Sequence, residues 1–158
     1  KKKGIIARIL YLDNYYIIPP GERKAWRMKY GIENIGPKEL DWHKINANIQ
    51  DFLNGRKAVM PCVDLISGMT DTLETHFEEV EVLILAGLYS IMAEPLHLKV
   101  FIELTYKETL EVQKALGKEE MDEFRLSILE KEYEEVMNLK PTADFYIDFD
   151  TSMEIFHL

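Results

Sequence analysis

The chain has 158 residues, the length of one domain, of which 47% are hydrophobic and 30% are charged. This balance is typical of a globular protein and excludes a disordered or fibrous chain. The net charge of −9 disfavours broad binding to nucleic acid or to an anionic membrane, because both need clustered positive charge. No apolar run approaches the roughly 20 residues of a membrane span. The single cysteine excludes an internal disulfide, and we expect a cytoplasmic protein.

The first predicted element is a strand over residues 5–12, where the apolar run IIARILYL stops at Asp13. A near-continuous apolar run is typical of a parallel strand buried on both faces. A long excursion follows that carries three of the six prolines, and GERKAWRMKYG within it predicts a helix. The apolar spacing of LDWHKINANIQDFLNG predicts a second helix, with Asp41 as its N-cap and Gly55 as its stop.

Shorter elements are predicted in the rest of the chain. KAVMPCVDLISG indicates a strand and a turn, and TDTLETHFEE a connecting segment or a second short strand. Further strands are predicted over about residues 80–85, in HLKVFIEL and in ADFYIDFD, with amphipathic helices broken near Gly117 between the last two. Apolar strands separated by helices indicate an α/β fold with a mostly parallel sheet. No second domain is evident, so we predict a single domain over residues 1–158.

The order of these segments resembles that of the uridine kinase and phosphoribulokinase family of P-loop kinases. LDNYY is similar to the family's Asp-x-Phe/Tyr-Tyr turn, and ENIGPKELDW to its proline-containing segment before a Phe-Asp-Trp helix start. GRKAVMPCVDLISG is similar to its Pro-x-Tyr-Asp-Phe strand and turn, VEVLILAGLYSI to its Val-Glu-Gly strand, and ADFYID to its last strand. The resemblance implies a three-layer P-loop kinase-like domain. It also implies transfer of phosphate from ATP, with Mg²⁺, to a hydroxyl group of a small metabolite.

The family's phosphate-binding motif, G-x-x-x-x-G-K-[ST], does not occur in the 158 residues. KKKGIIARILYL is similar to the end of the helix that follows this motif, running into the family's second strand. We therefore expect the sequence to lack the first strand, the P-loop and its helix, about 25–35 residues on ordinary element lengths.

The resemblance implies roles for residues that follow two of the strands. Asp13 matches the carboxylate that accepts the proton of the substrate hydroxyl and lies near the Mg²⁺; the alternative is an Asp that only caps a turn. Tyr15 and Tyr16 either contact the substrate or close the core beneath the loop. Asp64 matches the Asp of the Tyr-Asp-Phe turn, and it either lines the acceptor pocket or forms the turn.

Basic residues are the candidates for phosphate or for an acidic acceptor. Arg23 and Arg27 lie on the first predicted helix, where a solvated helix face is the alternative. Lys118 and Arg125 lie in the segment that matches the family's Arg-rich lid, and they are candidate phosphate contacts. A residue on the helix surface is the alternative for Arg125.

Several positions depart from the family pattern. Ala86 stands where the family has a second carboxylate near the metal, and Ile35 where its nucleoside kinases have the Asp that binds the ribose. Val63 and Leu65 replace the Tyr and Phe that recognise the pyrimidine, and Arg125 is the single arginine of the lid segment. These changes disfavour uridine and leave a second hypothesis, a degenerate, non-catalytic binding or regulatory domain. Members of the family often form dimers or tetramers, so a homo-oligomer is compatible with the resemblance.

Overall fold

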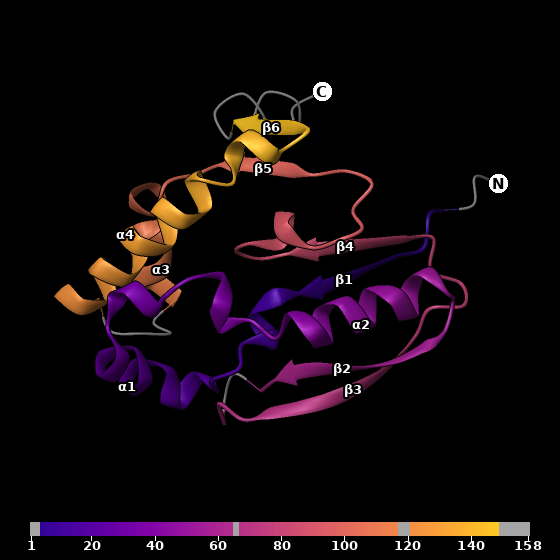
Figure 1. The fold of residues 1–158 in the computed structure, drawn as a ribbon, viewed down its shortest axis with the longest axis horizontal. Helices are drawn as coiled ribbons and strands as arrows, with labels where there is room; N and C mark the ends of the chain where they lie inside the picture. Colours follow the sequence, from indigo (N-terminus) through magenta and orange to yellow (C-terminus); the bar gives the residue numbers. More distant parts are fainter. Residues whose placement is uncertain (1–3, 65–66, 117–120, 149–158) are drawn as a thin grey trace. The chain divides into compact units, whose positions relative to one another are not determined.

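A computed structural model gives the fold of the chain and describes residues 4–64, 67–116 and 121–148 (Figure 1). The internal contacts divide the chain into two compact units, which we call unit 1 (Lys1–Pro95) and unit 2 (Leu96–Leu158). In its described residues, each unit has its own parallel pair of strands and its own pair of α-helices. The single domain predicted over residues 1–158 stays a prediction.

The parallel pair of unit 1 joins the first strand of the chain to the fourth. β1 (Ala7–Tyr11) pairs with β4 (Val82–Ala86), so that Tyr11 lies opposite Ala86 at the carboxyl ends of both strands. β1 runs directly into η1 (Leu12–Tyr15), a 3-10 turn. The strand therefore ends at Tyr11, one residue before the predicted end at Leu12, and Asp13 lies within the turn that follows it.

The connection from β1 to β4 contains two helices and a hairpin. The helices are α1 (Pro20–Tyr30) and α2 (Trp42–Leu53), and the antiparallel hairpin consists of β2 (Lys57–Val63) and β3 (Thr70–His76). Both helices lie where the sequence predicts them. At the start of α2, Asp41 Oδ1 accepts a hydrogen bond from the backbone nitrogen of Lys44 at 2.9 Å, which confirms the predicted N-cap.

The core of unit 1 forms where α2 packs against β2 and η1, and Figure 1 shows α2 running alongside the hairpin. Burying apolar side chains between these elements is the main stabilising contribution. The buried apolar residues of this unit include Leu10, Leu12, Tyr15, Ile35, Leu40, Ile45, Ile49, Ala58 and Phe77.

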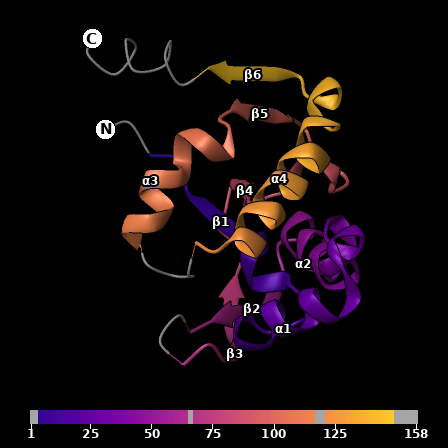
Figure 2. The same cartoon turned by 90° about the vertical axis from the view of Figure 1, so that its left-hand side faces the viewer.

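Unit 2 is built on a second parallel pair, which Figure 2 shows side by side. β5 (Val100–Glu103) pairs with β6 (Phe145–Asp148), and α3 (Tyr106–Leu116) and α4 (Glu123–Met137) lie between them in the chain. The N-cap of α4 is Asp122, whose carboxylate accepts from the backbone nitrogen of Arg125 at 2.7 Å. None of the helices in the described residues is long and apolar enough to cross a membrane.

The strands are more exposed than the sequence predicts. In β1 only Leu10 is buried, whereas Ile9 and Tyr11 are 44% and 53% exposed, and every residue of β6 is exposed. The prediction of a strand buried on both faces is therefore wrong for β1. The reason is that each parallel pairing in the described residues joins only two strands, and α2 packs chiefly on β2 and η1. Two of the three strand pairings in the described part of the chain are parallel, which confirms the predicted α/β class.

Candidate functional site

The candidate site lies at the carboxyl ends of β1 and β4, where open α/β folds bind their ligands. Asp13 is exposed, while its neighbours in the turn, Leu12 and Tyr15, are 1% and 2% exposed. The turn packs closely against Gly87, the residue after β4. A Cβ added to Gly87 would lie only 3.1 Å from the Cβ of Leu12. Because Leu12 and Tyr15 are buried, the turn is held in place, and Asp13 between them is exposed to solvent.

Tyr15 anchors this turn in the core. Its hydroxyl donates a hydrogen bond to Oδ1 of Asn48 on α2 at 2.8 Å, and both side chains are buried. Burial raises the pKa of the Tyr15 hydroxyl above its ordinary value, because the low-dielectric surroundings disfavour the phenolate. The sequence left two roles open for Tyr15, contact with the substrate or closure of the core beneath the loop. This geometry favours closure of the core.

Tyr16 and Arg23 lie together beside the turn. The guanidinium carbon of Arg23 is 3.7 Å from the centre of the Tyr16 ring, a cation–π contact. Nε and Nη2 of Arg23 also lie 3.4 and 3.3 Å from the backbone oxygen of Ile18, to which they donate. The structure therefore brings a positive charge and an aromatic ring from the predicted set next to the segment that follows Asp13.

Arg27 lies deeper, in the last turn of α1, and is 3% exposed. Its Nε and Nη2 donate to the two carboxylate oxygens of Glu39, each at 2.8 Å, and Glu39 is 4% exposed. Glu39 Oε2 also accepts from the backbone nitrogen of Gly36 at 3.2 Å, within η3 (Pro37–Glu39). Sequence reasoning missed Glu39; the available signal was its position three residues after Gly36, from which a glutamate can accept from the backbone nitrogen at the start of a helical turn.

Asp64 forms the turn of the β2–β3 hairpin. Its backbone nitrogen donates to the backbone oxygen of Met69 at 2.9 Å, and its Oδ2 accepts from the Ser67 hydroxyl at 2.9 Å. The hairpin end is held to the candidate site, since Oδ1 of Asn14 accepts from the backbone nitrogen of Val63 at 3.3 Å. The residue after Asp13 thus contacts the residue before Asp64, although Asp64 itself serves the turn.

The remaining predicted residues belong to unit 2. Arg125 lies in the first turn of α4, with its Nη1 3.9 Å from Oε2 of the buried Glu132. This distance makes an ion pair along the helix. Lys118 lies outside the described residues.

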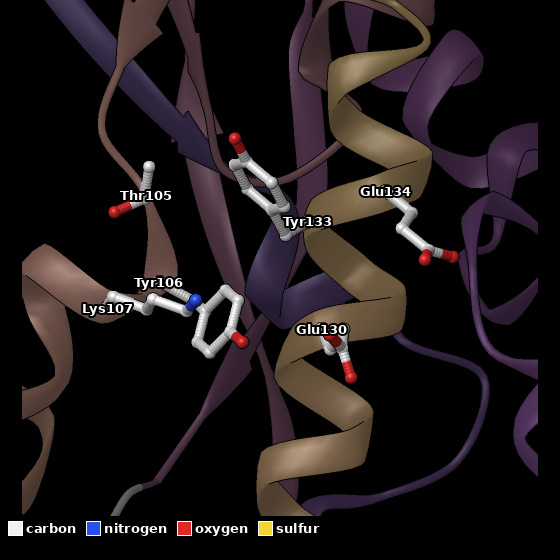
Figure 3. Close-up of a pocket in the computed structure, with 6 residues that line it drawn as sticks. All are labelled: Thr105, Tyr106, Lys107, Glu130, Tyr133 and Glu134. Carbon is white, nitrogen blue, oxygen red and sulfur yellow. The ribbon is translucent and has the colours of Figure 1, made fainter.

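A pocket of about 230 Å³ opens in unit 2 between the start of α3 and α4 (Figure 3). The rings of Tyr106 and Tyr133 meet edge to face there, with centroids 5.8 Å apart, and the Lys107 ammonium lies 5.9 Å from the centre of the Tyr106 ring. The residues that line the pocket are Thr105, Tyr106, Lys107, Glu130, Tyr133 and Glu134. Among the described residues, none of those predicted for the site lines this pocket.

The carboxylate available at the candidate site fits a metal ion that takes most of its ligands from water and substrate phosphates. Within residues 4–64, 67–116 and 121–148, no three His, Cys, Asp or Glu side chains gather so that they could hold a metal ion. Mg²⁺ usually keeps several waters and is bound by one or two carboxylates together with substrate phosphates. An exposed carboxylate such as that of Asp13 meets this requirement, whereas Ala86 at the end of β4 offers only a methyl group.

Parallel strand pairing and a helical crossover define an α/β fold. Two solved structures share it. A "putative fructose transport system kinase" from Silicibacter sp. TM1040 is 13% identical, with a TM-score of 0.59 over 91% of this chain and 76% of that one. A "possible uridine kinase" from Bacillus stearothermophilus is 14% identical, with a TM-score of 0.59 over 92% of this chain and 73% of that one.

At these identities the likeness establishes the fold alone. The uridine kinase-like fold predicted from the sequence is confirmed. No protein-family model matches the sequence, and no curated protein matches it either.

Proposed function

We propose that the chain is part of an ATP-dependent phosphotransferase that acts on a hydroxyl group of a small molecule, with Asp13 as the base. The observation that carries the proposal is the exposed Asp13 carboxylate in a turn anchored on both sides at the carboxyl end of β1. The likeness of the fold to two proteins described as kinases supports it.

The reaction needs few groups from the protein, because phosphoryl transfer depends mainly on positioning and on neutralising charge. The acceptor hydroxyl donates a hydrogen bond to Asp13. As its oxygen bonds to the terminal phosphorus of ATP, the bond from that phosphorus to the bridging oxygen breaks, and the proton passes to Asp13. Mg²⁺, which Asp13 would hold together with the phosphates, supplies neutralisation of the phosphate charge.

Two of the other predicted residues contact the acceptor in this proposal. Tyr16 and Arg23 contact it on one side, with the arginine offering charge to an anionic substituent. Tyr15 holds the turn, and Asp64 closes the hairpin turn next to Val63, whose backbone nitrogen donates to Asn14. We expect Lys118 and Arg125 to contact phosphate, as the match of their segment to the family's lid implies.

A second candidate function is a non-catalytic domain that binds a ligand. Ala86 favours it, since a methyl group at the carboxyl end of β4 cannot contribute to a metal site. The two functions differ in whether ATP is consumed.

The test uses the natural full-length protein and measures release of ADP in the presence of nucleosides, sugars and sugar phosphates in turn. With an acceptor identified, Asp13→Asn should lower kcat by about 10²–10⁴-fold, the usual contribution of a general base. Stability should hardly change, because the side chain is exposed. Asp71→Asn, an exposed aspartate on β3, is the matched control and should keep full turnover.

Unchanged turnover in Asp13→Asn would remove Asp13 from the role of base. Absence of ADP release with every acceptor, together with ligand binding detected by calorimetry, would favour the binding domain.

A further inference from the structure

Residues 13–41 of unit 1 form a loop whose two ends meet. The chain leaves η1, passes through α1 and returns as residues 36–41, which pair with residues 15–17. The backbone nitrogen of Ile17 donates to the backbone oxygen of Glu39, and that of Asp41 to the backbone oxygen of Tyr15, each at 2.8 Å. Tyr16 and Leu40 form an isolated antiparallel bridge between these bonds. The returning segment is thus attached within four residues of Asp13.

The ion pair of Arg27 and Glu39 ties α1 to the returning segment. Both side chains are almost fully buried, and the two parallel hydrogen bonds at 2.8 Å fix the orientation of the carboxylate as well as its position. The same Glu39 contributes the backbone oxygen that accepts from Ile17. A change in the side-chain pair therefore acts directly on the segment beside Asp13.

We propose that Arg27 and Glu39 are positioning residues for Asp13, a role that rests on the proposed function of Asp13 as the base. Their ion pair fixes residues 36–41, which hold residues 15–17 and through them the turn η1. In this assignment Arg27 acts through Glu39, in place of the direct substrate contact predicted from the sequence.

A positioning role of the ion pair can be distinguished from a purely stabilising one by replacing its two residues singly and together. Arg27→Met and Glu39→Leu each leave the partner's charge buried, and should both lower stability. The double variant removes both charges of the pair, and an apolar pair in place of a buried ion pair is often as stable as the original. It nevertheless lacks a directional contact between α1 and residues 36–41.

The double variant should therefore regain the stability that the single variants lose, as measured by urea unfolding, without regaining function. We expect kcat to stay about tenfold to a hundredfold below the wild type, with KM for ATP within about twofold, since a small misplacement of a reacting group has effects of this size. The amides of Ile17 and Asp41 should exchange their hydrogens about tenfold faster, because their hydrogen bonds open locally. Wild-type kcat and wild-type exchange in the stable double variant would overturn the proposal.

Arg27→Lys is the second variant, used where the double variant does not fold. It keeps the positive charge and loses the two-pronged geometry, so the same rise in exchange and fall in kcat are expected. Lys57→Met with Glu74→Leu removes an exposed pair on the hairpin, at 2.9 Å in the structure, and should change none of these measurements.

The exchange measurement does not need phosphotransferase activity. If the wild-type protein transfers no phosphate, the proposed function fails, while faster exchange at Ile17 and Asp41 would still establish that the pair holds the turn. Unchanged exchange with an active wild type would reject the positioning role alone.

Discussion

At the scale of single residues, Tyr15 is where the candidate site is fixed to the core. Tyr15→Phe removes the hydroxyl that donates to Asn48 and leaves the amide oxygen of Asn48 buried without that donor. We expect the free energy of unfolding at pH 7 to fall by about 1–2 kcal/mol. Equilibrium unfolding in urea measures the change, and equal stability of the two proteins would show that the hydrogen bond contributes nothing.

The same residue gives a pH dependence. Because the native pKa of Tyr15 is raised above the ordinary value of about 10, the native state holds the proton more tightly than the unfolded chain does. This contribution is complete below pH 10 and declines as the pH rises above it. The stability difference between wild type and Tyr15→Phe should therefore narrow above about pH 10.

The residue contacts were only partly predictable from the sequence. Asp13 could be placed after a strand because the apolar run stops there, and Asp41 could be predicted as a cap from its position before the helical pattern. The pairs Tyr15–Asn48 and Arg27–Glu39 join residues from separate elements, and local periodicity carries no information about such contacts. The sequence therefore indicated Arg27 as a candidate site residue, whereas its burial against Glu39 became evident only from the structure.

At the scale of elements, α2 depends on its first turn. Asp41→Ala removes the acceptor for the backbone nitrogen of Lys44, so we expect a loss of about 1 kcal/mol in the free energy of unfolding. Asp41→Asn keeps an acceptor of the same shape and is the control, with a loss well below that of the alanine variant. If both variants unfold at the same urea concentration as the wild type, the cap does not stabilise α2.

Helices were predicted more accurately than strand environments, for a physical reason. A helix has local signals at both ends, such as Asp41 before α2 and Gly55, with φ of 58°, after it. The burial of a strand depends on what covers its two faces, and nothing in the residues 7–11 themselves specifies that. Hence β1 was predicted within two residues of its start and end, and its exposure was not predicted.

At the scale of the whole chain, the structure raises the question of how many cooperative units there are. Contacts cluster within unit 1 and within unit 2, whereas the sequence pattern predicted one domain. A domain in the thermodynamic sense unfolds in one step, so the number of transitions decides the question.

The two tryptophans of the chain, Trp26 and Trp42, both lie in unit 1, so their fluorescence reports on unit 1. The circular dichroism at 222 nm has contributions from the helices of both units, including α3 and α4 of unit 2. If the units unfold separately, as the clustering of contacts leads us to expect, the urea transitions followed by fluorescence and by circular dichroism will not coincide. Asp122→Ala removes the cap of α4 and should then shift the dichroism transition alone, while Asp41→Ala should shift the fluorescence transition. Coincident transitions that both variants move together would establish a single domain, because a change in one unit would then destabilise the whole chain.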